Sequence, residues 1–224
     1  MSELESTLEQ IRRNYKVETV PLKLGGKEMK VLQIEDFESY VEELIETQNA
    51  GPRDLPYWAK LWDTSLILAY FLGKQPVVPW QRMLEIAAGV GVIGIYASLC
   101  GHNVTITDIE DDALLFAKAN VLLNGAAARV QKLDWRSPDI DERYEVIFGS
   151  EVIYDRKTYP LLVAFLRKAL APNGTIFLAR NTSLHVPAFF EELTRYFKFK
   201  HTVRTVRSGD ETQQVSLYAV RFKD

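Results

Sequence analysis

A regular alternation of strand-like and helix-like segments after Met83 restricts the fold of this chain more than any other feature of its sequence. Short apolar runs alternate with longer segments that have helical periodicity. Strands joined through helices in this way form a parallel sheet that helices cover on both faces. The predicted strands are 83–86, 104–107, 129–133, 145–149 and 175–180, and the predicted helices are 92–100, 111–123, 159–170 and 187–197.

The C-terminal region breaks this alternation. Residues 201–207 and 214–222 are both strand-like, and Ser208-Gly209-Asp210 joins them without a helix between. Such a pair forms a hairpin, so one strand must run antiparallel to the others. We therefore predict an α/β fold, with a Rossmann-like, doubly wound, seven-stranded sheet and an antiparallel C-terminal hairpin strand.

The N-terminal part predicts a separate layer. Residues 1–16 and 36–47 have helical periodicity, and residues 17–34 alternate as strands around Gly25-Gly26, which is a hairpin signal. We predict an N-terminal extension of helix, hairpin and helix over 1–54, packed on a main domain at 55–224.

Composition excludes several classes of protein. Hydrophobic residues are 47% and charged residues 25% of the chain, which is typical of a folded globular domain. No apolar run reaches the roughly 20 residues that span a bilayer, and the acidic first residues do not resemble a signal peptide. One cysteine, Cys100, and three scattered histidines predict neither a disulfide nor a metal site. We expect a cytoplasmic location.

The charge balance argues against nucleic acid as a partner. Arginine and lysine number 27 and aspartate and glutamate 30, which gives a net charge of −3. Proteins that neutralise phosphates usually carry a basic surface. The one basic segment, Arg195–Arg207, is interpreted as a solvated sheet edge in preference to a binding patch.

A glycine-rich turn follows the first strand of the alternating region. It contains Glu85, Ala87, Ala88, Gly89 and Gly91 and opens a helix. Small residues there let the backbone approach a ligand, and the helix N-terminus presents free N–H groups. Asp108, followed by Ile109, ends the next strand, where a carboxylate can accept both ribose hydroxyls. Alternatively, Gly89-x-Gly91-x-x-Gly94 would cradle the pyrophosphate of a nicotinamide cofactor.

The spacing Glu85-x-Ala87-x-Gly89-x-Gly91 resembles the E-x-G-x-G-x-G loop of class I S-adenosylmethionine methyltransferases. Ala87 replaces the first glycine and fits if its φ is negative. The acid at Glu85 and the reversed C-terminal hairpin favour this family over a dehydrogenase, whose sheet is normally all parallel. The resemblance implies S-adenosylmethionine as cofactor and S-adenosylhomocysteine as product.

Three further segments resemble the D-x-x-Y group of seven-β-strand protein-lysine methyltransferases. They are Trp62-Asp63 before an apolar helix, Leu133-Asp134-Trp135 at a strand end, and Gly149-Ser150-Glu151-Val152-Ile153-Tyr154-Asp155. Glu151 stands where the group has aspartate. The prolines of the Asn/Asp-Pro-Pro-Tyr/Phe pattern of adenine methyltransferases are absent from this segment, which argues against methylation of that base.

The resemblance implies a cofactor role for the residues around the turn, and each has an alternative. Trp62 would close the cofactor pocket, or be core only. Trp135 would stack on the adenine, or only pack. Asp134 would bind the adenine amino group or cap a turn, and Ser150 would lie near the adenine or the methionine end. Tyr57 and Trp58 form either a substrate wall or a staple onto the sheet.

Glu151 and Tyr154 are the predicted catalytic residues because both follow a strand at its carboxyl end, where open α/β sheets bind ligands. A lysine ammonium, with a reference pKa of about 10.4, must lose a proton before methylation. A carboxylate and a phenol could orient the amine, and positioning supplies much of the catalysis. Alternatively, Glu151 caps a helix and Tyr154 is a half-buried aromatic.

The sequence thus predicts an enzyme that methylates a protein lysine. A small-molecule N- or O-methyltransferase on the same scaffold is the alternative, and an enclosed acceptor pocket would favour it. A cofactor-binding module without catalysis is a third hypothesis, and an NAD-dependent dehydrogenase is a fourth.

Overall fold

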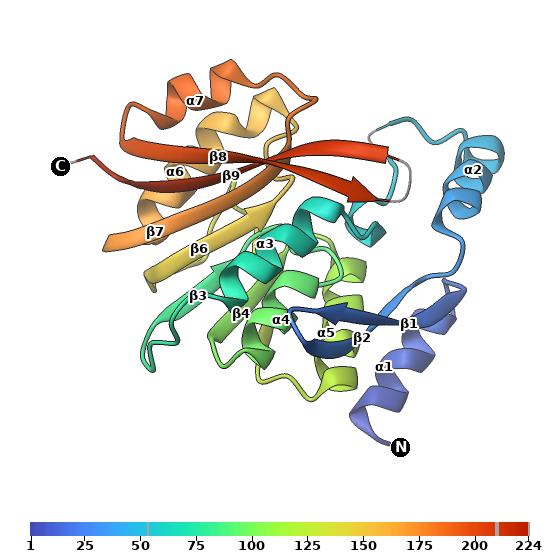
Figure 1. Ribbon diagram of the computed structural model, residues 1–224. Helices are drawn as coiled ribbons and strands as arrows, with labels where there is room; N and C mark the ends of the chain where they lie inside the picture. Colours follow the sequence, from blue (N-terminus) through green and yellow to red (C-terminus); the bar gives the residue numbers. More distant parts are fainter. Residues whose placement is uncertain (53, 209–210, 224) are drawn as a thin grey trace.

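A seven-stranded sheet forms the centre of the molecule (Figure 1). The computed structural model describes residues 1–52, 54–208 and 211–223. The strand order is β5-β4-β3-β6-β7-β9-β8, in which β9 is antiparallel to β7 and β8 and the other pairs are parallel. This is the predicted Rossmann-like sheet with an antiparallel C-terminal hairpin. The strands are β3 (Arg82–Glu85), β4 (Asn103–Asp108), β5 (Arg129–Lys132), β6 (Tyr144–Ser150), β7 (Leu170–Asn181), β8 (Phe197–Ser208) and β9 (Glu211–Phe222).

Helices cover both faces of this sheet because successive strand residues point to opposite sides. Met83 packs into the core under α3, α4 and α5, whereas the next residue, Leu84, packs into the core under α6 and α7. Within the described residues, no helix is both long and apolar enough to cross a bilayer. The helices are α3 (Asp63–Gly73), α4 (Val92–Leu99), α5 (Asp111–Asn124), α6 (Tyr159–Ala169) and α7 (Pro187–Leu193), with 3-10 turns η1 (Tyr57–Ala59) and η2 (Arg156–Thr158).

The N-terminal residues form the predicted helix, hairpin and helix. They are α1 (Glu3–Arg12), β1 (Val17–Leu24), β2 (Lys27–Ile34) and α2 (Phe37–Gln48). The two strands pair with each other in a sheet of their own, and α1 and β2 contact α5. Figure 1 shows this layer beside the helices of one sheet face. The division of the chain at residue 54 stays a prediction.

The C-terminal hairpin is longer than the sequence suggested. Helix α7 ends at Leu193, and β8 begins at Phe197 because this ring stacks on Phe222 of β9, with centroids 4.9 Å apart. Gly209 and Asp210 of the predicted turn lie outside the described residues. Lys200 and Arg204 are exposed on the edge strand β8, whereas the side chain of Arg207 is outside the described set.

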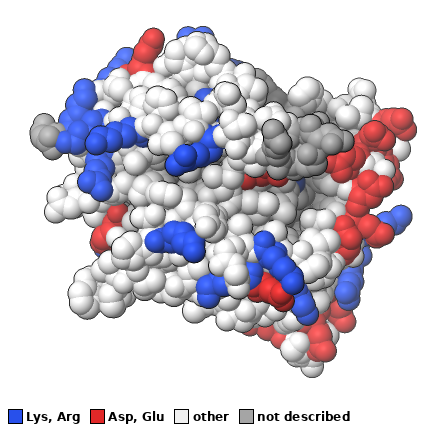
Figure 2. Space-filling view, viewed as in Figure 1, with Lys and Arg blue, Asp and Glu red and all other residues white. Residues whose placement is uncertain are grey.

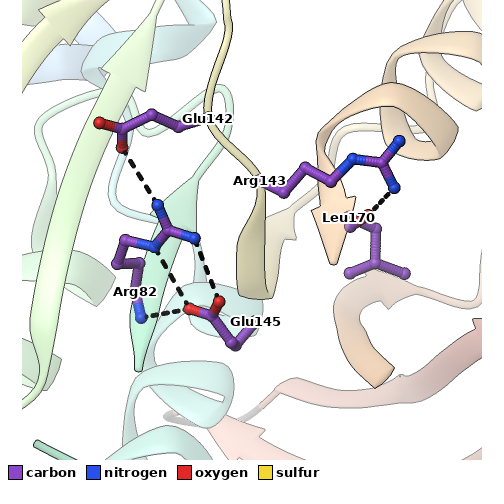
Figure 3. Close-up of polar contacts among 5 residues, drawn as sticks. All are labelled: Arg82, Glu142, Arg143, Glu145 and Leu170. Atoms are coloured by element: carbon purple, nitrogen blue, oxygen red, sulfur yellow. Dashed lines mark hydrogen bonds and ion pairs between the residues drawn. The ribbon is translucent and has the colours of Figure 1, made fainter. Parts of the chain in front are cut away.

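An arginine joins the amino ends of β3 and β6. The guanidinium of Arg82 donates to both carboxylate oxygens of Glu145, at 3.2 and 3.5 Å, and its backbone N–H donates at 2.7 Å (Figure 3). Glu142 lies 3.7 Å from the same guanidinium. The charges of these three side chains are thus paired with one another at the amino ends of the strands.

Candidate active site

A cavity of about 770 Å³ lies at the carboxyl ends of the strands. Its walls come from the turn after β3, the ends of β4 and β6, and the segment before α3. The chain reverses its direction of strand addition between β3 and β6, which is where open α/β sheets hold ligands. The predicted residues that line the cavity are Trp62, Ala87, Ala88, Gly89, Asp108, Ile109, Asp134, Trp135, Ser150, Glu151 and Tyr154.

Glu85 and Gly91 lie behind the cavity wall. Glu85 is fully buried, and its Oε2 accepts a 2.9 Å hydrogen bond from the Gly94 N–H in the first turn of α4. Its Oε1 has no partner among the described residues. Burial raises the pKa of Glu85 well above its usual value, and the Gly94 hydrogen bond only partly offsets this. A Cβ at position 94 would collide with this carboxylate, which explains the glycine there.

The turn after β3 uses left-handed backbone at three positions. Gly89 has a φ of +54° and Gly91 of +82°. Ala87 has a φ of +48°, so the negative angle expected for it is wrong. A residue with a Cβ is strained in this region, and such strain persists where the surroundings hold it. A Cβ at Gly89 would collide with the carbonyl oxygen of Trp58, so the turn and the segment before α3 approach closely.

Asp108 organises the turn from the neighbouring strand. Its Oδ2 accepts from the Gly89 N–H at 2.8 Å, and its Oδ1 accepts from the N–H groups of Ile109 and Glu110 at 2.7 and 3.1 Å. Burial raises its pKa, and these three hydrogen bonds oppose the shift. The carboxylate is thereby fixed at the cavity wall.

Aromatic side chains border the cavity at two places. Trp62 donates from its indole N–H to the Tyr57 carbonyl at 3.3 Å, and the Lys60 ammonium lies 5.2 Å from its ring centroid. Trp135 is half-buried beside the end of β5. The Asp134 carboxylate accepts from the backbone N–H and guanidinium of Arg136 at 2.9 Å, which is a turn cap, and its role toward the adenine stays a prediction.

Glu151 follows β6 in a left-handed conformation, with a φ of +55°. Its Oε1 accepts from the backbone N–H of Asn181 at 2.7 Å. Burial raises its pKa, and the contacts with Asn181, the Thr64 hydroxyl and Arg180 counteract the rise only in part. The strained backbone and these contacts fix a carboxylate of increased basicity at the cavity wall.

Tyr154 stands three residues further on, at the mouth of the cavity. Its side chain is 66% exposed, although it belongs to the cavity lining. Ser150 donates to the Thr64 hydroxyl at 2.8 Å and so ties the end of β6 to the start of α3. Because Tyr154 is exposed, the part of the cavity next to it is open to solvent.

Sequence reasoning missed Thr64 and Asn181, which hold Ser150 and Glu151, and Lys60, which also lines the cavity. Asn181 acts through its backbone N–H, so its residue type carries no signal. Lys60 could have been found from the sequence, because this cation stands two residues before Trp62, an aromatic residue predicted to lie at the cofactor pocket.

Charged side chains are unevenly spread over the molecular surface. In Figure 2, acidic residues gather over α1 and α2, and basic residues gather near the C-terminal end of β9. The exposed acids of these two helices are Glu3, Glu5, Glu9, Glu38, Glu42, Glu43 and Glu46.

The geometry suits a nucleoside with an amino-acid tail. The cavity volume lies within the about 300–1,000 Å³ of small-molecule sites. Ala87, Ala88 and Gly89 line the cavity with small or no side chains, so a ligand can contact the backbone of the turn. Residues 55–196 match a family model described as lysine methyltransferase.

The chain belongs to the lysine methyltransferase family. It is an S-adenosylmethionine-dependent methyltransferase, as the sequence predicted.

Two curated relatives support this assignment. EEF1A lysine methyltransferase 3 of Mus musculus is 35% identical over 191 residues, which are 81% of this chain and 79% of the relative. Protein N-lysine methyltransferase METTL21A of Danio rerio is 35% identical over 175 residues, or 69% of this chain and 80% of the relative.

Solved structures show the same fold. A TehB-like SAM-dependent methyltransferase from Corynebacterium glutamicum superposes with a TM-score of 0.57 and 18% identity, over 84% of this chain and 98% of that one. At this identity the likeness concerns the fold alone.

Proposed function

We propose that this methyltransferase transfers a methyl group from S-adenosylmethionine to a lysine amine of a protein substrate. The observation that carries the proposal is the position of Glu151 and Tyr154 in the same cavity as the glycine-rich turn. The names of the relatives support a protein lysine as acceptor, and EEF1A is the first protein to test.

The cofactor would lie along the cavity from Trp135 to Trp62. Asp108 would accept the ribose hydroxyls, because its carboxylate is fixed at the wall. Trp135 would stack on the adenine. Ala87, Ala88 and Gly89 would contact the methionine part through their backbone. Glu85 and Gly91 would act indirectly, by shaping the turn and the start of α4.

The cofactor supplies an electrophilic methyl group on a sulfonium. Glu151 would bind the amine nitrogen and favour its alignment, since burial makes this carboxylate more basic than an exposed glutamate. Tyr154 would donate or accept a hydrogen bond at the mouth of the cavity. The amine would release its proton to solvent, which reaches Tyr154 directly.

The open mouth of the cavity favours a protein substrate over a small molecule. An enclosed acceptor pocket was the expectation for a small-molecule enzyme. Tyr154 is instead 66% exposed, so a lysine on a large surface can reach it. A cytoplasmic location, and the absence of nucleic acid among the partners, remain predictions.

Labelled S-adenosylmethionine with purified EEF1A, and with extract of cells that lack this protein, tests the proposal. We expect label on a protein band and, by peptide mass spectrometry, on a lysine. Glu151→Gln and Tyr154→Phe should each lower the rate at least tenfold, because each removes a group that orients the amine.

Glu142→Gln and Tyr70→Phe are the matched controls. Glu142 contacts Arg82 at the amino ends of the strands, and Tyr70 lies on α3 outside the cavity lining. Both should keep full activity. Label only in small molecules, or on a residue other than lysine, would contradict the proposed acceptor.

A further inference from the structure

Two asparagines of α5 pair with the backbone of β2 in the N-terminal hairpin. Asn124 accepts from the Lys30 N–H at 2.8 Å and donates to the Lys30 carbonyl at 2.7 Å. Asn120 accepts from the Leu32 N–H at 2.6 Å and donates to the Leu32 carbonyl at 3.2 Å. Residues four apart on a helix lie about 5–6 Å apart, and residues two apart on a strand about 6.6 Å. The two side-chain amides can therefore act as a partner strand.

Asn120 makes one contact that Asn124 lacks. Its Nδ2 also donates to the carbonyl of Val90, at 3.1 Å, between the two glycines of the cofactor turn. The corresponding bond of Asn124 returns to the Asn120 carbonyl in its own helix. Of the two amides, Asn120 alone therefore joins the hairpin to the cofactor turn, and it is fully buried.

The bond to Asn120 fixes the peptide between Val90 and Gly91 from one side. On the other side, the Gly91 N–H donates to the Ala88 carbonyl at 3.0 Å. The turn has left-handed backbone at Ala87, Gly89 and Gly91, a conformation that lasts only where the surroundings hold it. Without Asn120, the Val90 carbonyl would lose its buried donor, which is unfavourable.

We propose that Asn120 is a positioning residue through which the N-terminal hairpin and the cofactor turn stabilise each other. The docked hairpin holds the amide of Asn120, and this amide holds the turn in its binding conformation. Coupling of this kind is reciprocal, so cofactor binding must also hold the hairpin more tightly. The inference rests on the proposed cofactor site, but it concerns binding and not the methyl acceptor.

Calorimetry with S-adenosylhomocysteine on full-length variants tests the first direction. Asn120→Ala should raise the Kd at least tenfold, whereas the matched variant Asn124→Ala should change it less than twofold. Both substitutions remove two hydrogen bonds to β2, and only Asn120→Ala also removes the bond to the Val90 carbonyl, so the two variants are compared at equal folded stability, measured by urea unfolding. Equal effects of the two substitutions, or no effect of Asn120→Ala in folded protein, would overturn the proposal.

Hydrogen exchange tests the reverse direction, from cofactor binding to the hairpin. It uses the protein without substitutions and so does not depend on the folding of a variant. Saturating S-adenosylhomocysteine should slow exchange of the Leu32 amide at least fivefold, while the amide of Val220 in β9 should change less than twofold. Protection of the cofactor turn without protection of β2 would overturn the coupling but leave the cofactor site intact. Absence of binding would overturn both.

Discussion

Glutamate side chains lie at both ends of strands β3 and β6, but the two sets are held in different ways. We call the amino ends of these strands the amino edge and their carboxyl ends the carboxyl edge. At the amino ends, Glu145 lies against the guanidinium of Arg82, and Glu142 is close by (Figure 3). At the carboxyl ends, Glu85 and Glu151 are held by backbone N–H groups of Gly94 and Asn181, with no ion pair among the described residues.

The pKa values of these carboxyls shift in opposite directions. Partial burial would raise the pKa of Glu145, but the hydrogen bonds from Arg82 outweigh it and the pKa falls. Burial raises the pKa values of Glu85, Asp108 and Glu151, and N–H donors offset it only in part. The carboxylate of Glu145 thus already has a cationic partner, whereas Asp108 and Glu151, which line the cavity, would gain from a ligand that donates hydrogen bonds.

The largest expected difference between the two edges concerns cofactor binding. Asp108→Ala should weaken binding of S-adenosylhomocysteine by about 1.5–3 kcal/mol, or roughly 10- to 150-fold, because a charge-assisted hydrogen-bond acceptor is lost. Glu145→Gln at the amino edge should leave the affinity within twofold. Calorimetry measures both, and unchanged affinity in Asp108→Ala would remove the ribose role.

The sequence predicted which residues come together at the carboxyl edge, because the position of a residue at a strand end decides on which edge it lies. Alternation located the strands, and the carboxyl ends of parallel strands meet at one edge, so Asp108, Ser150 and Glu151 could be placed together. The C-terminal hairpin was predicted in the same way, although its long strands were underestimated, because Phe197 was assigned to the preceding helix.

The contacts that fix this edge could not be predicted to the same extent. Thr64 and Asn181 come from elements far away in the chain, and only folding shows that they meet Glu151. The left-handed φ of Ala87 has no signature in an alanine. Asn120 did carry a signal, because it is a polar residue four positions after Phe116 on a buried helix face.

The second expected difference is in the pH dependence of stability. The folded-state pKa of Glu85 is raised, so its contribution is full below the unfolded pKa of about 4.3 and is lost as the pH rises through the folded pKa. The unfolding free energy of the unmodified protein, relative to Glu85→Gln, should therefore fall with rising pH, by at most about 1.4 kcal/mol per pH unit.

Glu145→Gln should give the opposite sign. The folded-state pKa of Glu145 is lowered, so its contribution is present above the unfolded pKa and is lost as the pH falls through the folded pKa. Urea unfolding of the three proteins between pH 3.5 and 9 measures both slopes. Slopes of equal sign would contradict the contrast between the edges.

A smaller effect is expected for the ion pair itself. Arg82→Met should lower the unfolding free energy by about 1 kcal/mol and Tm by about 2–4 °C, because the side chain is partly exposed and solvent screens it. Lys132→Met, which breaks a more exposed pair with Asp111, should cost about 0.5 kcal/mol or less. A changed affinity for S-adenosylhomocysteine in Arg82→Met would show that the edges are not independent.

The smallest expected effect concerns strain at the carboxyl edge. Glycine in place of alanine makes the unfolded chain more flexible, which costs about 0.4–1 kcal/mol of stability. At Ala87 this cost is opposed by relief of the left-handed strain, which is about 1–2 kcal/mol per residue. The half-buried methyl group of Ala87 also packs against the core under α6, and its loss reduces the gain. Ala87→Gly should therefore change the unfolding free energy by only about 0.5 kcal/mol.

Ala88→Gly is the matched comparison, because Ala88 is the next residue, also half-buried, and is not among the residues with positive φ. No strain is relieved there, and its methyl group also packs against the core under α4, so the full flexibility cost of about 0.4–1 kcal/mol applies together with the packing loss. Chemical denaturation should thus show Ala88→Gly to be the less stable of the two variants. Equal losses of unfolding free energy would mean that the backbone at Ala87 is unstrained. A larger loss in Ala87→Gly would mean that packing of the Ala87 methyl group stabilises the protein more than the backbone strain destabilises it.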